Sequence, residues 1–158
     1  MNTKGSQSVS NTLLRLYLVL FSGLPRPTGV VVLSNTSSTD VRVWQTGNQW
    51  GDTALSFEVL HNGLVLRIVR REQEYTRNVP SSFVLPVKSR HEWPFDLGDG
   101  DWDAETPIDQ VAGRHTQLVA VYDVPTTPEA LNHGVWTGQL RSEPVLLDES
   151  GPSPRKPD

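Results

Sequence analysis

The chain has 158 residues, a formal net charge of −4, twelve glycines, twelve prolines and no cysteine. Its length suits a single domain, and the missing cysteines exclude disulfides, thiolate nucleophiles and cysteine-based zinc sites. The acidic balance argues against nonspecific binding to nucleic acid, and the glycine and proline content favours short strands joined by turns.

The first expected strand covers residues 13–21 and follows a polar stretch, 1–12, that is expected to be disordered. Every second residue from Leu14 to Leu20 is leucine, which is the period of a strand with one buried face. Residues 1–24 could instead act as an export signal, but Arg15 interrupts the apolar run and no small-residue cleavage site follows it. The run is too short to span a bilayer, and a cytoplasmic location is favoured.

The middle of the chain predicts six further strands separated by turn residues. Their ranges are 30–35, 41–44, 55–60, 64–70, 83–87 and 91–97. The pair Asn62-Gly63 predicts a tight hairpin between two of these strands. Residues 46–52 are predicted to be a loop, and residues 98–114 a long acidic loop without a strand. A loop of that length is uncommon in a compact domain and is often functional or flexible.

The last third of the chain predicts a closing hairpin. Residues 117–124 carry apolar side chains on both faces, which indicates a central strand covered on both sides. Thr127-Pro128 has the pattern of a helix cap followed by the first helical residue, and Gly134 ends that short helix. Residues 135–147 then predict the returning strand.

These elements together predict an all-β fold, an antiparallel Ig-like β-sandwich of about seven to nine strands. The domain is expected to cover residues 13–148, with residues 149–158 as a disordered tail. Unequal strands and long connections suit crossovers between two sheets better than an up-and-down barrel.

Three segments together carry a family resemblance. They are VVVLSNTSSTDVRVW at 30–44, the Asn-Gly turn before LVLRIVRRE at 64–72, and VAVYDV at 119–124 followed by GVWTGQLRSEPVLL at 134–147. In this order they resemble bacterial Ig-like or fibronectin-III-like sandwiches, including BsuPI-like intracellular proteinase inhibitors. The resemblance implies the sandwich fold and carries over no inhibitory residue. The long acidic loop departs from it.

The sharpest local feature is the acidic segment 96–105. Its alternating aspartates include Asp99, Asp101 and Asp103. Oxygen ligands at alternate positions suit calcium, yet Ala104 and Gln110 replace the glycine and closing glutamate of an EF-hand loop. The alternative to a calcium site is a solvated acidic loop whose Trp102 folds back onto the sandwich.

Two of the five tryptophans, Trp50 and Trp102, are expected in loops. Exposed loop aromatics mark recognition surfaces, and these two loops would form an aromatic and acidic patch if they met at one end of the sandwich. The alternative is that both rings cover the ends of the core. An arginine cluster is separately predicted to form an exposed basic edge that prevents further strand pairing. Its members are Arg67, Arg70, Arg71 and Arg77.

The leading hypothesis is a non-enzymatic binding domain for a protein or peptide partner, without a cofactor and without catalytic residues. The residues expected to bind the partner are Trp50, Trp102, Asp99, Asp101 and Asp103. The alternative is a BsuPI-like proteinase inhibitor, and the third hypothesis is a carbohydrate-active or hydrolase-associated domain. No nucleophile elbow, dinucleotide-binding motif or phosphate loop occurs in the sequence.

Overall fold

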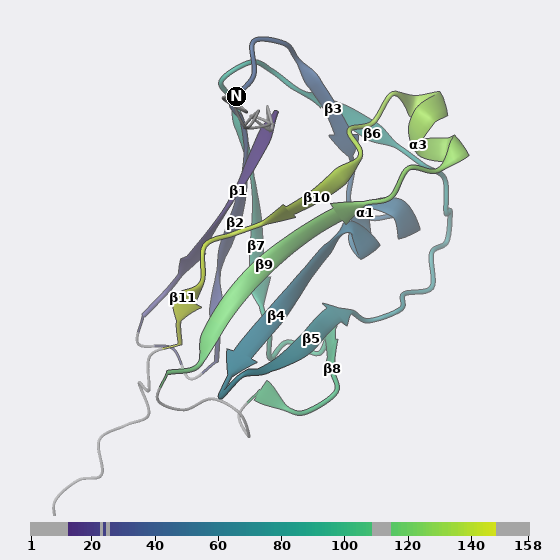
Figure 1. The fold of residues 1–158 in the computed structure, drawn as a ribbon. Helices are drawn as coiled ribbons and strands as arrows, with labels where there is room; N and C mark the ends of the chain where they lie inside the picture. Colours follow the sequence, from purple (N-terminus) through teal and green to yellow (C-terminus); the bar gives the residue numbers. More distant parts are fainter. Residues whose placement is uncertain (1–12, 23, 25, 109–114, 148–158) are drawn as a thin grey trace, which may run out of the picture.

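The computed structural model describes residues 13–22, 24, 26–108 and 115–147 (Figure 1). The two predicted disordered tails, 1–12 and 149–158, lie outside the described residues, as do residues 109–114 of the predicted acidic loop.

Eleven strands and two short helices are found within the described residues. The strands are β1 (Leu14–Leu20), β2 (Thr28–Asn35), β3 (Val41–Trp44), β4 (Leu55–His61), β5 (Leu64–Arg70), β6 (Ser82–Leu85), β7 (Arg90–Asp96), β8 (Trp102–Ala104), β9 (Gln117–Val124), β10 (Gly138–Arg141) and β11 (Val145–Leu146). The helices are α1 (Gln49–Ala54) and α3 (Pro128–His133). In the described part of the chain, no helix combines the length and apolar character that a membrane crossing requires.

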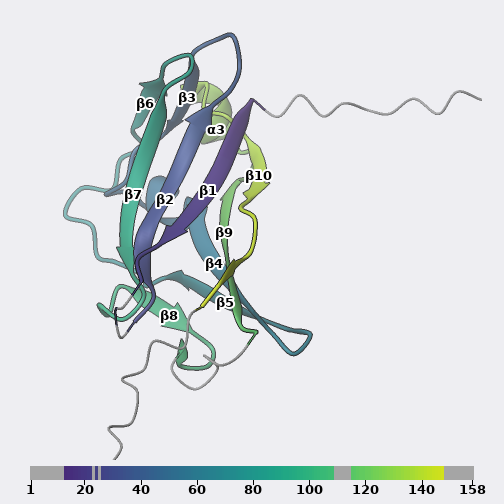
Figure 2. The same cartoon turned by 90° about the vertical axis from the view of Figure 1, so that its left-hand side faces the viewer.

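Two antiparallel sheets form the layers of a β-sandwich, as Figures 1 and 2 show from two directions. One sheet has the order β1-β2-β7, and the other has the order β10-β9-β4-β5-β8 with β11 also paired to β9. Strands β3 and β6 form a separate pair. The predicted all-β sandwich is therefore confirmed, and β9 lies inside its sheet as its two apolar faces predicted. The finer Ig-like topology stays a prediction.

The core lies between the two layers. The leucines of β1 alternate as predicted, with Leu14, Leu16 and Leu18 buried. Phe57 of β4 is fully buried and contacts Phe95 of β7, with ring centroids 4.6 Å apart. Aromatic pairs of this kind add about 0.5–1.5 kcal/mol beyond the area that they bury.

The short elements confirm several predictions from local sequence. Asn62 and Gly63 have positive φ angles of 48° and 77°, which is the backbone that a two-residue hairpin requires. Thr127 accepts a hydrogen bond from Ala130 N–H at the start of α3, and Gly134 ends this helix in the left-handed conformation.

Three expectations were wrong. The predicted loop 46–52 is largely helical, because α1 begins at Gln49. The predicted loop 98–114 contains β8, which pairs with β5 over Ile68, Val69 and Arg70. The arginine cluster is therefore not a free edge, because β8 covers that end of β5. With β8 added and residues 135–147 divided into β10 and β11, the strand number exceeds the predicted range.

Replacing Phe57 with alanine is expected to lower the free energy of unfolding by about 3–5 kcal/mol, because the cavity left between the layers cannot fully close. Urea unfolding measures the loss. Tyr17→Ala is the matched control: Tyr17 is 46% exposed, so its loss should stay within about 0.5 kcal/mol. Equal losses for the two variants would place Phe57 outside the core.

Candidate functional site

Helix α1 is held against the sandwich by one buried side chain, Asn48. Its Oδ1 accepts a hydrogen bond from Gly51 N–H at 3.0 Å, and its Nδ2 donates to Gln45 O at 2.9 Å and to Ser81 Oγ at 3.0 Å. This capping satisfies a helix donor that would otherwise lack a partner. A Cβ on Gly51 would lie 1.9 Å from Gln45 O, so only glycine permits this packing. Gly51 and the adjacent Asp52 are thereby fixed in place.

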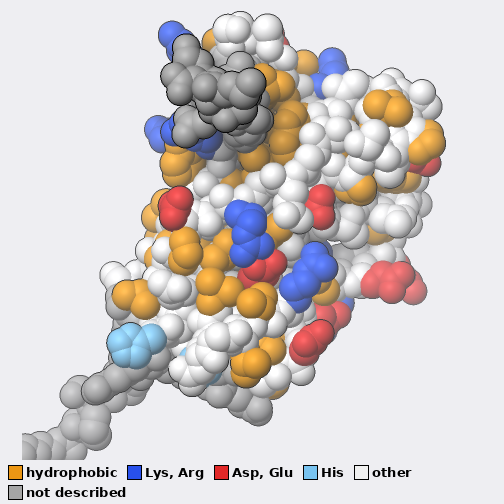
Figure 3. Space-filling view, viewed as in Figure 1, with side chains coloured by type: hydrophobic (Ala, Val, Ile, Leu, Met, Phe, Trp, Pro, Cys, Tyr) orange, Lys and Arg blue, Asp and Glu red, His pale blue; other side chains and the backbone are white. Residues whose placement is uncertain are grey.

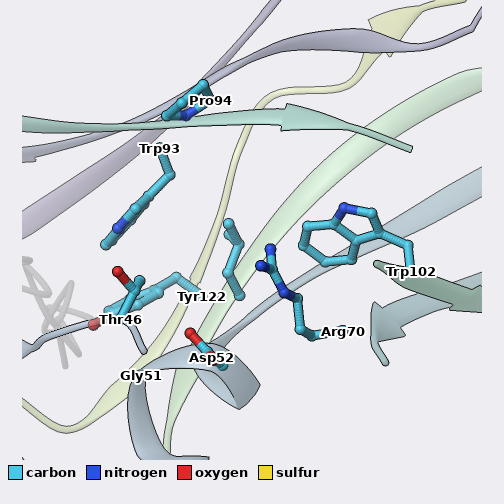
Figure 4. Close-up of a pocket in the computed structure, with 9 residues that line it drawn as sticks. Thr46, Gly51, Asp52, Arg70, Trp93, Pro94, Trp102 and Tyr122 are labelled. Atoms are coloured by element: carbon cyan, nitrogen blue, oxygen red, sulfur yellow. The ribbon is translucent and has the colours of Figure 1, made fainter. Parts of the chain in front are cut away.

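A cavity of about 200 Å³ opens beside α1 between the two layers (Figure 4). We call it the donor pocket. It is lined by Thr46, Gly51, Asp52, Leu55, Arg70, Trp93, Pro94, Trp102 and Tyr122. Strand β7 contributes one wall, strands β4, β5, β8 and β9 contribute the opposite wall, and α1 with the segment before it contributes the third. Figure 4 shows Trp93, Thr46 and Tyr122 grouped on one side, with Arg70 and Trp102 on the other.

The donor pocket concentrates buried polar atoms that lack partners. Among the described residues, four buried side-chain atoms have no partner within the protein at hydrogen-bond geometry, and all four belong to residues that line this pocket. They are Arg70 Nε, Trp93 Nε1, Trp102 Nε1 and the Tyr122 hydroxyl. Three of these groups can only donate. Buried polar groups are nearly always paired in folded proteins, so their convergence marks this cavity as different from ordinary core.

The three aromatic donors are also among the most enclosed residues of the pocket. Trp93, Trp102 and Tyr122 are 9%, 7% and 1% exposed. Trp93 stacks on Tyr122 with ring centroids 5.3 Å apart, and Trp102 packs edge-on against Phe57 at 5.0 Å. Burial raises the pKa of the Tyr122 hydroxyl, while the nearby backbone of Trp44 lowers it by less. Tyr122 therefore stays protonated and able to donate.

One carboxylate, Asp52, belongs to the pocket wall. Its Oδ2 accepts a hydrogen bond from the Tyr75 hydroxyl at 2.9 Å, and its Oδ1 accepts from Gly47 N–H at 2.9 Å. Both bonds hold the carboxylate in one orientation. Burial, and next the hydrogen bond to Asp52, raise the pKa of Tyr75 to about 12.

Arg70 supplies the positive charge of the pocket, and that charge is already balanced. Its guanidinium lies 3.6 Å from Asp101 and 5.2 Å from the centre of the Trp102 ring. The second contact is a cation–π interaction, which adds about 0.5–2 kcal/mol depending on exposure. These two contacts fix Arg70 at the wall while its Nε remains without a partner.

The structure separates the two tryptophans that the sequence suggested would converge. Trp102 lines the donor pocket, but it begins a strand and is buried rather than exposed in a loop. Trp50 is half-buried in α1, packs against Trp44 with ring centroids 6.2 Å apart, and lines a different cavity. The segment carrying Trp50 nevertheless reaches the donor pocket through Gly51 and Asp52.

The three candidate calcium ligands do not face a common point. Asp101 pairs with Arg70, and Asp103 pairs with Arg71 at 2.8 Å. Asp99 accepts a hydrogen bond from the backbone N–H of Asp101 at 2.9 Å, which closes its own turn. Within the described residues, no three histidine, aspartate or glutamate side chains gather in a way that could hold a metal ion. The alternating aspartates Asp101 and Asp103 instead form ion pairs with Arg70 and Arg71, beside the pairing of β8 with β5.

Of the five residues that carry the unpaired donors and the carboxylate of the pocket, only Trp102 was in the predicted site. Trp93 and Tyr122 alternate into the core, and this pattern alone cannot reveal that their polar atoms lack partners. Arg70 was assigned to an exposed edge. Asp52 could have been found, because an asparagine followed by an acidic residue within one turn is a pattern of helix starts. Asn48 caps α1, and Asp52 lies in its first turn.

Replacing Asp52 with asparagine is expected to lower the pKa of Tyr75 from about 12 toward its ordinary value of 10.0, because the acceptor carboxylate and its negative charge are lost. The remaining rise is due to burial. The titration of the Tyr75 ring carbon in NMR measures the change, with Tyr75→Phe assigning the signal. An unchanged pKa in Asp52→Asn would show that Asp52 does not hold Tyr75 in solution.

Comparison with known proteins gives this pocket no precedent. No family model matches the chain, and neither a curated protein nor a solved structure matches it.

Proposed function

We propose that this chain is a non-enzymatic binding domain that recognises its partner through the donor pocket. The observation that carries the proposal is the set of four buried polar atoms without partners around one cavity. Leaving such a group unpaired costs about 1–3 kcal/mol. A ligand that brings acceptor atoms into the pocket recovers part of that free energy, which is a driving force for binding.

The pocket is also built for a fixed geometry. Its walls are strands of both sheets, and the side chains that bear the donors are held by packing of their rings. Sites carried on strands and locked by neighbouring side chains are preorganised, so little entropy is lost when a ligand is bound. Asp52 is held by Tyr75 and Gly47, which favours a role as a fixed acceptor rather than as a general base.

The face drawn in Figure 3 favours recognition in a pocket over recognition by a charged surface. Figure 3 shows basic and acidic side chains interspersed among hydrophobic ones on the face that it draws, without a broad area of one sign among the coloured atoms. Binding sites for small groups are concave and mostly apolar, with a few placed polar atoms. The donor pocket has this composition.

Replacing Tyr122 with phenylalanine tests the proposal, because it removes one unpaired hydroxyl and keeps the ring. The free energy of unfolding should change by no more than about 1 kcal/mol, since the hydroxyl donates to no partner within the protein. The pocket should meanwhile lose ligand affinity. Thermal unfolding measures the first effect, and ¹⁵N–¹H NMR of the tryptophan indoles measures the second during a screen of small oxygen-bearing compounds.

Hits should shift the indole signals of Trp93 and Trp102 most and leave that of Trp50 in place. Trp50, which lines a different cavity, is the internal control, whereas Trp136 stacks on Tyr122 and should follow the pocket with a smaller shift. Binding should weaken by about threefold to tenfold in Tyr122→Phe, the range of one hydrogen bond. A screen that moves neither pocket indole refutes the proposal, and so does a large loss of stability in Tyr122→Phe, which would assign the hydroxyl a structural bond.

A second candidate function is proteinase inhibition, and the β4–β5 hairpin favours it. This hairpin extends beyond the rest of the molecule in Figure 2. Just after its Asn62-Gly63 turn, Leu64 and Val65 are 64% and 58% exposed. Exposed apolar residues on a projecting turn are suited to insertion into a cleft on a partner.

A panel of serine, cysteine and metalloproteases tests this second candidate. If the hairpin inhibits a protease, Leu64→Asp should abolish inhibition, because a charged side chain is costly to bury in an apolar cleft. Leu131→Asp is the matched control, since Leu131 is 66% exposed on α3. Inhibition that survives Leu64→Asp, or that is absent against every protease, excludes the hairpin as an inhibitory loop.

A further inference from the structure

The charges around the donor pocket restrict what it can bind. Arg70 already faces Asp101 at 3.6 Å, and a second carboxylate, Asp52, belongs to the wall. One guanidinium thus stands against two carboxylates. An anionic ligand would be repelled by Asp52, and Arg70 would compensate this repulsion only in part because it already pairs with Asp101. An ammonium group can only donate, so it adds no acceptor for the indole donors and meets Arg70 as a like charge. The need for acceptors, taken together with this charge arrangement, favours an uncharged ligand.

The hydrogen-bonding groups restrict the ligand further. The two indole N–H groups of Trp93 and Trp102 and the Nε–H of Arg70 can only donate, so they need acceptors. The Tyr122 and Thr46 hydroxyls can donate or accept. Asp52 only accepts, and each of its oxygens has one further lone pair after bonding Tyr75 and Gly47. Hydroxyl groups meet both needs, because each one accepts and donates.

The remaining lining is apolar and the space is small. Leu55, Pro94 and the rings of Trp93 and Trp102 supply apolar surface to the wall. Pockets for drug-sized ligands typically enclose about 300–1,000 Å³, whereas this cavity has about 200 Å³. It suits a single ring rather than an extended chain. A ring whose faces are C–H groups and whose edge carries hydroxyls presents apolar surface to the walls and acceptors to the donors.

We infer that the donor pocket binds one uncharged sugar ring, either free or as a unit of a glycan. This inference rests on the proposed function and assigns the ligand class of the same site. The hydroxyls of the ring accept hydrogen bonds from the indole N–H groups and from Arg70 Nε–H, and one hydroxyl donates to Asp52. The ring faces pack against the apolar wall.

Three probes with the same ring size and different charge test the inference. They are an uncharged hexose set (glucose, galactose and mannose), the matching uronic acids, and glucosamine as the cationic form. Titrations are followed by the indole signals of Trp93 and Trp102 and by calorimetry. At least one uncharged hexose should bind in the millimolar range, and its uronic acid should bind at least about tenfold more weakly, a difference set by Asp52.

Asp52→Asn provides the variant that distinguishes charge from shape. The substitution keeps the size of the side chain and removes its charge, so the preference for the hexose over its uronic acid should shrink toward equal affinity. Trp50→Phe, outside the pocket, is the control and should leave all affinities unchanged. A preference that is unaltered in Asp52→Asn overturns the role assigned to Asp52 in selecting an uncharged ring.

The outcomes separate this inference from the proposed function. Tighter binding of the uronic acids, or of glucosamine, overturns the uncharged sugar and retains the pocket as a binding site. The same conclusion follows if no sugar binds while triglycine or another oxygen-bearing fragment shifts the Trp93 and Trp102 indoles. If sugars shift only the indoles of the other tryptophans, or if no compound shifts any of them, both the sugar assignment and the pocket are refuted.

Discussion

The hydrogen bonds of Asn48 fix the position of α1 beside the cavity between the two sheets. A buried amide must bond all of its polar atoms, and Asn48 does so by joining Gly51, Gln45 and Ser81. Residues 45–51 and the separate stretch that carries Ser81 are therefore joined at one side chain. The backbone of α1 approaches its own preceding loop so closely that Gly51 has no room for a Cβ. The position of Asp52, which follows Gly51 in the wall of the donor pocket, depends on this contact.

The pocket and the core share the same aromatic side chains. Trp93 of β7 stacks on Tyr122 of β9, and Tyr122 stacks in turn on Trp136 at 6.1 Å. These rings connect the two layers. Because Trp93 and Tyr122 also line the cavity, a change in the packing of the sheets would change the shape of the cavity. Because a ligand that binds only the folded state stabilises it, occupancy of the pocket and stability of the sandwich are coupled through these rings.

Local periodicity predicted most strands, because a strand with one buried face alternates apolar and polar residues along the sequence. The leucines of β1, the Asn62-Gly63 turn and the cap at Thr127 each carry their own signal within a few positions. Helix α1 and strand β8 were missed for a different reason. The contact of Asn48 with Ser81 spans 33 residues, and β8 exists because Trp102 pairs with Arg70 of β5. Neither partner can be identified from nearby sequence.

The donor pocket could not be predicted from the sequence for a related reason. Tryptophan and tyrosine at inward positions normally signify core, as the alternation of β7 and β9 predicted for Trp93 and Tyr122. Whether their polar atoms find partners depends on side chains from five strands and a helix, and no single segment records that arrangement. The acidic pattern at Asp101 and Asp103 had the opposite property: it suggested a ligand site and turned out to pair strands.

Pro94 has a consequence for how this molecule avoids self-association. Strand β7 ends its sheet, so its outer side has no neighbouring strand within the sheet order. Edge strands of this kind can recruit a strand from another chain and begin aggregation. A proline has no N–H to donate to an added strand, and Pro94 lies in β7 at the wall of the cavity. The residue that helps to line the pocket therefore also interrupts the pattern of donors that an added strand would need.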